Sequence, residues 1–426
     1  MSRRTIEIVK TVLILLLTIS GMFLAWQAGI LNGVVAAFPV IENTLEMVRG
    51  TGGGLVTPTR DATIQEAARP LSIVITDSAG ERFGVRNNTE LRDDVYNAAG
   101  GILGDALGSA SAHTQVTEGE WRQALSGSSF FFEYITPIRL SVLRQWLGME
   151  GADTAYDVEI RRMFVSFGEE RSRIYFQDHN SGLHFGADTG LVSSRAYELG
   201  VFAPNGAMFA FESGLRGYES APYLLILQDV YHLDIQSAVA GSQQEILELG
   251  LNLFNHMYEA PPTNFSGEAL MGFGTNFNLR VDPDGRMIYR WTSETLRGDI
   301  SEPSIGEMIE VARDLVADSI AQMCGEAEVM FESIEYNEGL YSVIFGFYFA
   351  GGRIYLYDDR PAAEVTFDSG NIIEAELNFR SFVPAGTLTR LMPQRQAFAA
   401  AGGEFILTYL DTGAQVLYPS WVRVWF

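Results

Sequence analysis

The feature that most constrains this 426-residue chain is an apolar run near its amino terminus. The stretch TVLILLLTISGMFLAW covers residues 11–26, and between Thr11 and Leu31 only Gln27 is strongly polar. At 1.5 Å per residue, a helix over residues 11–31 is about 31 Å long, enough to cross the hydrocarbon core of a bilayer. The sequence therefore predicts a transmembrane helix at residues 11–31.

A cleaved signal peptide is the alternative interpretation of this run. Its apolar part would be shorter, and a small-x-small cleavage site should follow it, where this chain has Trp26 and Gln27. We therefore expect an uncleaved membrane anchor.

The charges before the run predict its orientation. Residues 1–10 hold three basic side chains and one acidic side chain, and basic segments stay on the cytoplasmic side of a membrane. We expect residues 1–10 to be a cytoplasmic tail and the C-terminal domains to be extracytoplasmic, on the outer side of the cell membrane. Trp26 is then expected at the outer membrane interface and Lys10 at the inner one.

Small residues recur at intervals of four within and just after the run. On a helix they form a ridge along one face, which allows membrane helices to pack closely, so the ridge predicts a partner helix. The alternative is chance, because the chain holds 43 glycines. The predicted helix-packing face consists of Gly21, Ala25, Gly29 and Gly33.

Composition excludes several classes of function. The net charge of −24 repels nucleic-acid phosphates, so nucleic-acid binding is excluded. Lys10 is the only lysine, so the body of the protein has no lysine for a P-loop, a kinase site or a Schiff base. Cys324 is the only cysteine, which rules out an intramolecular disulfide, and we expect it to be a small buried side chain.

Turn and linker signals divide the chain into parts. The glycine-rich stretch RGTGGGLVTPTRD at residues 49–61 has no hydrophobic period and predicts a flexible linker. We expect an α+β fold class, with one transmembrane helix followed by a multidomain extracytoplasmic region of antiparallel sheets packed with helices. The expected parts are a cytoplasmic tail (1–10), the transmembrane helix (11–31), a juxtamembrane segment and linker (32–69), an N-terminal α+β domain (70–215), a central α+β domain (216–325) and a mainly β C-terminal domain (326–426).

Hydrophobic periodicity predicts the elements of the N-terminal domain. The segment FFFEYI at residues 130–135 is expected to be a strand, and it is too apolar to be exposed. Further strands are expected at 71–75, 82–85, 158–166 and 172–178, and helices at 90–107, near 117–125 and at 138–147.

In the central domain we expect a helix over residues 243–258 and a hairpin over 276–291. The strongest helix signal covers residues 301–324, with Ser301 as its cap and Pro303 in its first turn. The C-terminal domain is predicted to be largely strands, at the segments YSVIFGFYF, RIYLYD, AEVTF, IIEAELNF, EFILTYLD and VLYPSWVRVWF. A helix before a meander thus recurs, which suggests two related modules.

The sequence predicts no catalytic, cofactor or metal site. His179 and His184 have no third histidine nearby, so we expect turn or surface roles rather than zinc binding. Asp282 and Asp284 in DPDG are better explained by a hairpin turn than by a calcium loop. We expect a non-enzymatic protein that binds or regulates. An envelope hydrolase with a carboxylate pair stays open, because the spacing of such a pair is spatial rather than sequential.

The order of elements resembles that of the YycH family. The basic tail and membrane helix, LSIVITDSAGERFGV, FEYITPIRLSVLRQWLG, LGLNLFNHMYE and LRVDPDGRMIYRW carry the resemblance. The closing stretch, from YSVIFGFYF through IIEAELNF to VLYPSWVRV, is similar to the domain shared by YycH and YycI and to PepSY-type modules, in which a helix packs on an antiparallel sheet. These motifs are degenerate patterns of strands and turns, not catalytic signatures.

The resemblance implies a non-enzymatic membrane regulator of a WalK-like sensor histidine kinase, in a two-component system for cell-wall homeostasis, with a YycI-like partner. The chain departs from the family in its arginine bias, its acidity and its glycine-rich linker, which leaves the kinase and the sign of regulation open. The alternative function is an extracytoplasmic ligand-binding module for wall fragments or peptides, in which the aromatics of FFFEYI line a groove. Core packing is the competing interpretation of those aromatics.

Overall fold

The computed structural model describes residues 67–423, apart from 150–156, 169–170, 216, 229, 255–262, 266–268, 294–302, 402 and 412–414. Residues 61–426 belong to one compact unit. The predicted cytoplasmic tail, the transmembrane helix and residues 32–66 of the predicted juxtamembrane segment and linker lie outside the described residues. Among the helices that are described, none is long and apolar enough to span a bilayer.

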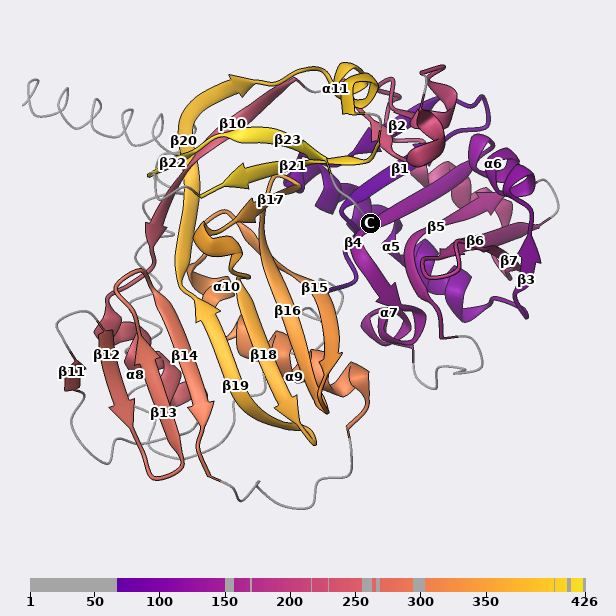
Figure 1. Ribbon diagram of the computed structural model, residues 1–426. Coiled ribbons are helices and arrows are strands. Elements are labelled where there is room, and N and C mark those ends of the chain that lie inside the picture. The colour runs from indigo at the N-terminus through magenta and orange to yellow at the C-terminus, as the bar shows by residue number, and fades with distance from the viewer. Residues whose placement is uncertain are drawn as a thin grey trace, which may run out of the picture. The chain divides into compact units, whose positions relative to one another are not determined.

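The first part of the described chain forms a seven-stranded antiparallel sheet, here called the N-terminal sheet (Figure 1). Its strand order is β2-β1-β4-β5-β6-β7-β3. The strand predicted at residues 130–135 is confirmed as part of β4, where Phe130, Phe131 and Phe132 are fully buried. The strands are β1 (Ser72–Thr76), β2 (Arg82–Val85), β3 (Thr114–Val116), β4 (Ser129–Arg139), β5 (Glu159–Phe167), β6 (Ser172–Asp178) and β7 (His184–Asp188).

Three helices, α5 (Thr89–Gly108), α6 (Glu118–Ser126) and α7 (Leu140–Trp146), accompany this sheet in the described chain. Local capping explains where two of them begin: the Asn88 side chain accepts a hydrogen bond from the Leu91 N–H, and Thr117 opens α6 with a capping box. Helix α7 begins two residues later than predicted. Ile138 and Arg139 instead extend β4, because they pair with β5.

The second large sheet, the C-terminal sheet, has eleven strands in the described residues (Figure 1). Its order is β11-β12-β13-β14-β19-β18-β16-β17-β21-β23, with β15 paired to β16, and only the β17–β21 pair is parallel. The strands are β11 (Thr263–Phe265), β12 (Ala269–Phe273), β13 (Phe277–Val281), β14 (Arg286–Trp291), β15 (Glu328–Asn337), β16 (Leu340–Phe349), β17 (Gly352–Tyr355), β18 (Ala363–Asp368), β19 (Asn371–Asn378), β21 (Phe405–Leu410) and β23 (Pro419–Arg423).

Pairing of β14 with β19 places strands from the predicted central and C-terminal domains in one sheet. The domain boundaries stay predictions. The antiparallel sheets and their helices confirm the coarser expectation of an α+β fold.

Helices pack on this sheet at two places. Helix α8 (Gln243–Leu253) lies on β12, β13 and β14, and helix α9 (Ile305–Ala317) lies against β15, β16 and β18. The approach of α8 requires Gly250, since a Cβ there would overlap Met287 and Leu279. Two shorter helices are α10 (Ile320–Met323) and α11 (Gln394–Ala401).

The prediction of one helix over residues 301–324 is wrong. A capping box of Ser304 and Glu307 starts α9 at Ile305, so Pro303 lies before the helix, and Ser301 is outside the described residues. The helix stops before Ser319, whose hydroxyl donates to the Leu315 carbonyl at 2.6 Å, and α10 follows as a separate turn. The helix predicted to run to residue 258 ends at Leu253.

A three-stranded sheet, here called the ribbon, has the order β20-β10-β22. Its long strands were absent from the sequence-based assignment. The pairing of β10 with β20 is irregular. Its register shifts between Leu233 and Ile235 of β10, opposite the part of β20 that contains Pro384 and Gly386. Gly386 has a φ of +76°, which glycine adopts without strain. The ribbon strands are β10 (Tyr231–Val239), β20 (Arg380–Arg390) and β22 (Val416–Leu417); β8 (Met208–Phe209) and β9 (Leu225–Ile226) form a separate short pair.

Candidate functional site

The N-terminal sheet meets the C-terminal part of the chain along a seam, and charged side chains are buried there. Glu133 of β4 follows three phenylalanines in the strand and, although it is an acidic residue, it is fully buried as they are. Glu404 lies just before β21 and is 9% exposed. We call the group around these two carboxylates the buried joint; it comprises Ser72, Arg86, Glu133, Arg161, Arg162 and Glu404.

Short contacts surround the Glu133 carboxylate. Its Oε1 lies 2.8 Å from Nη2 of Arg162, and its Oε2 accepts hydrogen bonds from the Ser72 hydroxyl at 2.8 Å and from Arg86 at 3.3 Å. The Nη2 atom of Arg161 lies 3.7 Å away. The same two consecutive arginines reach Glu404 Oε1, at 2.6 Å from Arg161 and 3.0 Å from Arg162. The joint therefore ties the centre of the N-terminal sheet to the start of β21.

Irregular strand pairing brings two consecutive arginines to one place. Successive side chains of a regular strand point to opposite faces. The pairing of β5 with β6 shifts between Ile160 and Met163, and the pairing of β4 with β5 shifts between Glu133 and Ile138. Such irregularities re-aim side chains, which explains how Arg161 and Arg162 both contact Glu133.

The arginines control the ionisation of the joint. Burial alone raises the pKa of Glu133, but Arg162, Arg86 and Arg161 outweigh it and lower this pKa to about 2. Burial likewise opposes ionisation of Glu404, and Arg162 and Arg161 lower its pKa. Both carboxylates are thus ionised near neutral pH and occupied by arginines, so neither suits general acid catalysis. The joint is built to hold two parts of the chain together.

A third carboxylate, Glu332 of β15, is also occupied by partners from the same chain. Tyr348 donates its hydroxyl hydrogen to Glu332 at 2.7 Å, and Arg353 Nη2 lies 2.6 Å from the other carboxylate oxygen. The Arg353 guanidinium also stacks 4.2 Å from the centre of the Tyr355 ring. Glu332 is the residue at the register shift of β15, between Phe331 and Ser333. Its carboxylate lies over Gly346 of β16, where any Cβ would overlap it.

A cavity of about 320 Å³ lies in the same seam, and we call it the seam cavity. The end of β4, α7, the end of α9, α10 and the first half of β15 form its walls. Its lining is mostly apolar and includes Ile138, Trp146, Val316, Cys324, Phe331 and Phe345.

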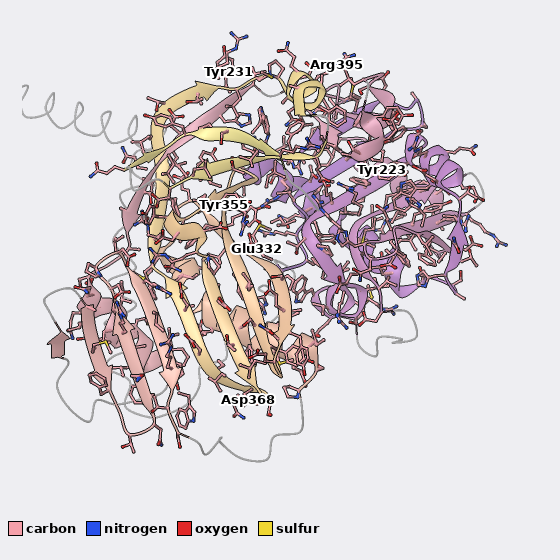
Figure 2. All side chains as sticks on the ribbon, viewed as in Figure 1. Tyr223, Tyr231, Glu332, Tyr355, Asp368 and Arg395 are labelled. Carbon is pink, nitrogen blue, oxygen red and sulfur yellow. The ribbon has the colours of Figure 1, made fainter. Side chains whose placement is uncertain are left out.

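The ribbon presents apolar side chains to solvent. Leu233 of β10 is directly opposite Leu388 of β20, and they are 37% and 60% exposed. Tyr231 is paired with Arg390, whose guanidinium lies 5.9 Å from the tyrosine ring, and Figure 2 shows Tyr231 on the outer side of the ribbon. The acidic residue of these two strands, Asp234, is buried and accepts a hydrogen bond from Thr387. We call the exposed group Tyr231, Leu233, Leu388 and Arg390 the ribbon face.

The site residues predicted from the sequence lie outside the described residues. These are the helix-packing face Gly21, Ala25, Gly29 and Gly33 and the interface residues Lys10 and Trp26, which stay predictions.

The two histidines considered for zinc do not share an environment. The His184 ring packs 4.6 Å from Trp121, and its Nε2 lies 3.4 Å from the Tyr223 hydroxyl. Burial lowers the pKa of both histidines, and Arg161 adds to the effect at His179. Within the described part of the chain, no three histidine, cysteine or acidic side chains are grouped for metal binding.

Three smaller predictions can be compared with the structure. Cys324 is confirmed as buried, and burial raises the pKa of its thiol to about 11. Asp282 and Asp284 lie in the turn between β13 and β14, as predicted. Core packing is confirmed for the aromatic residues Phe130, Phe131, Phe132 and Tyr134, which are all buried, and Tyr134 also lines the seam cavity.

The buried joint was not predicted from the sequence, although the sequence contains a signal for it. An acid inside FFFEYI and an arginine pair inside EIRRMFVSF are charges within otherwise apolar strands. Charges in such strands require partners, because an unpaired buried charge is costly. The identity of the partners could not be found this way, since Arg161 and Glu404 are 243 residues apart.

Comparison with known proteins gives a fold relationship. No family model matches the sequence, and no curated protein matches it. The crystal structure of YycH from Bacillus subtilis is similar, with a TM-score of 0.55 and 11% sequence identity, over 84% of this chain and 94% of that chain. The chain therefore has a YycH-like fold.

Proposed function

We propose that this protein, which has a YycH-like fold, is a membrane-anchored accessory regulator of a WalK-like sensor histidine kinase. The observation that carries the proposal is the fold similarity, which extends over 84% of the chain. The sequence patterns of strands and turns support the same family independently of the coordinates. The protein would act through protein contacts rather than as an enzyme, with a YycI-like protein as a second partner.

Two contact regions follow from this proposal. Inside the membrane, the ridge Gly21, Ala25, Gly29 and Gly33 would pack against a partner helix. Outside it, the ribbon face would contact the extracytoplasmic part of the kinase, since exposed apolar side chains in a connected group mark interaction surfaces. Although the chain is strongly acidic, the acid of β10 is buried, so the ribbon face tolerates acidic groups on its partner.

The joint suits a regulator because it makes the extracytoplasmic body rigid. The arginines of the joint bridge β4 and Glu404, the residue before β21, so they hold the N-terminal sheet and the C-terminal sheet together.

Crosslinking in membranes of a related cell, followed by identification of co-purified proteins, tests the proposal. We expect the full-length protein to recover a sensor histidine kinase and a YycI-like protein. The double variant Gly29→Leu, Gly33→Leu should lose them, and Leu233→Asp, Leu388→Asp should reduce recovery about tenfold, as for loss of a central apolar contact.

The double variant Val192→Asp, Val201→Asp is the matched control for the ribbon variant. Val192 and Val201 are 62% and 76% exposed and lie outside the ribbon, so their substitution adds the same two charges without touching the proposed contact. Equal recovery from all variants, or recovery of neither partner by the unmodified protein, would contradict the proposal.

The alternative function, an extracytoplasmic ligand-binding module, is favoured by a different observation, the seam cavity. Its apolar lining fits an apolar molecule better than a polar wall fragment. Retention of wall fragments by the purified protein would instead favour a module that binds wall fragments or peptides.

A further inference from the structure

Buried polar atoms without protein partners converge on the seam cavity. The Tyr134 side chain is 1% exposed, and its hydroxyl has no hydrogen-bond partner among the described residues. The same holds for the hydroxyl of Thr136 and for Oε2 of Glu328, and all three residues line the cavity. Buried polar side-chain atoms nearly always have a partner, whether protein, water or ligand, so these three atoms mark the cavity as a candidate binding site.

The cavity is braced rather than collapsible. The Trp146 indole N–H donates to Glu310 at 2.6 Å, which fixes α7 against α9. The buried Arg92 of α5 contacts Oε1 of Glu328 at 2.6 Å, which fixes the start of β15. With the buried joint close by on β4, these contacts hold the walls at a separation that leaves about 320 Å³. That volume is at the lower end of the roughly 300–1,000 Å³ typical of ligand pockets.

The charges around the cavity are already paired. Arg69 lies 3.0 Å from Asp93, Arg313 lies 2.7 Å from Glu310, and Glu328 is bound by Arg92. A charged ligand would have to compete with these partners or lose its hydration without compensation. The cavity therefore favours an uncharged ligand.

The polar atoms define what the ligand must carry. Burial raises the pKa of Tyr134 well above its ordinary value, so its hydroxyl remains a donor. Tyr134 and Thr136 suit a ligand oxygen that accepts hydrogen bonds, and the free oxygen of Glu328 suits a ligand hydroxyl hydrogen. A hydroxyl group meets both requirements, whereas a hydrocarbon meets neither.

We propose that the seam cavity binds a small, uncharged, largely apolar molecule that bears a hydroxyl group. This site goes beyond the proposed regulatory contacts and does not depend on which kinase is the partner. Its position between the N-terminal sheet and β15 means that an occupant touches both sides of the seam at once.

Photolabelling of the full-length protein in lipid nanodiscs tests this proposal. The probe is an eight-carbon primary alcohol that carries a diazirine, and mass spectrometry locates the labelled residues. We expect labels within 134–146 and 316–331, displaced by unlabelled octanol. Tyr134→Phe should reduce this labelling about fivefold, the loss expected for one hydrogen bond. Ala317→Phe, which adds a ring to the cavity wall, should abolish it.

The controls separate binding from partition into lipid and from unfolding. The matching eight-carbon carboxylate probe should label the cavity less than the alcohol, and Val192→Phe, at an exposed site, should leave labelling unchanged. Should Ala317→Phe fail to fold, Tyr134→Phe and octanol competition decide. Labels confined to other segments, or cavity labels that neither octanol nor Tyr134→Phe reduces, would overturn the proposal and mean that the hydroxyls are hydrated only.

Discussion

Two neighbouring residues of β4 are both buried, but they differ in whether their polar atoms have partners within the protein. Glu133 is fully buried, and Ser72 and three arginines surround its carboxylate. Tyr134 is 1% exposed, yet its hydroxyl has no partner in the part of the chain that the structure describes. Burial alone therefore does not distinguish a structural group from a functional one. A buried polar group whose hydrogen bonds are all made within the protein holds the seam together. A buried polar group without such a partner is available to a ligand.

Removal of the Glu133 charge should have the largest effect. Glu133→Gln leaves Arg86, Arg161 and Arg162 buried with Glu404 as the remaining carboxylate of the joint. Breaking a buried ion pair from one side typically costs about 3–5 kcal/mol, so we expect the free energy of unfolding to fall by this amount. Denaturant unfolding followed by tryptophan fluorescence measures it.

Glu374→Gln is the matched control for Glu133→Gln. Glu374 pairs with Arg290 at 2.8 Å, but both side chains are substantially exposed. Surface pairs contribute about 0–1 kcal/mol, so the control should change stability little. Equal losses from the two substitutions would show that the joint is no stronger than a surface pair.

The second-largest expected loss of stability, after that of Glu133→Gln, is the loss caused by acid. The pKa of Glu133 is about 2 in the folded protein and near its ordinary 4.5 when unfolded. Because folding lowers this pKa, its stabilising contribution is complete above about pH 5 and is lost as pH falls toward 2. At about 1.4 kcal/mol per pKa unit, the loss is about 3 kcal/mol.

Denaturant unfolding at pH values from 7 to 2 measures this dependence. Glu133→Gln lacks the titrating group, so its stability should fall less steeply over the same range than that of the unmodified protein. Parallel pH profiles for the two proteins would show that Glu133 does not ionise as its arginine contacts require.

The elements were largely predictable where local signals act alone. The hairpins of β1 with β2 and of β13 with β14 follow from alternation and turn residues, and capping residues set the start of α6 and α8. The long strand β20 was not predictable in this way. Pro384 and Gly386 argue against a strand, and only pairing with β10 across a bulge makes room for them.

The seam was not predictable because its contacts are distant in the sequence. Glu133 inside FFFEYI signals a buried acid, but its partners come from β1, from β5 and from Arg86, the residue after β2. The segment before β21 supplies Glu404, which the arginines of β5 also contact. The lone hydroxyl of Tyr134 gives no signal at all, because the lack of a partner appears only when every neighbour is in place. Tertiary packing thus determines both kinds of site.

The smallest expected change in stability is that of Tyr134→Phe, and it tests the contrast between Glu133 and Tyr134 most directly. Tyr134→Phe removes a hydroxyl that has no protein partner and keeps the ring, so stability should stay unchanged or rise by up to about 1 kcal/mol. Tyr348→Phe is the matched control, because that hydroxyl donates to Glu332 and its loss should cost about 1.5–3 kcal/mol. Thermal and denaturant unfolding of both variants compare them.

The signs of these two changes matter more than their sizes. If Tyr134→Phe destabilises the protein as much as Tyr348→Phe does, the Tyr134 hydroxyl is satisfied by ordered water, and the contrast with Glu133 disappears. If stability is retained while labelling of the seam cavity by the alcohol probe falls, the hydroxyl contributes to ligand binding and not to folding. A polar group retained in the core at no benefit to stability is what a binding site, rather than a structural contact, requires.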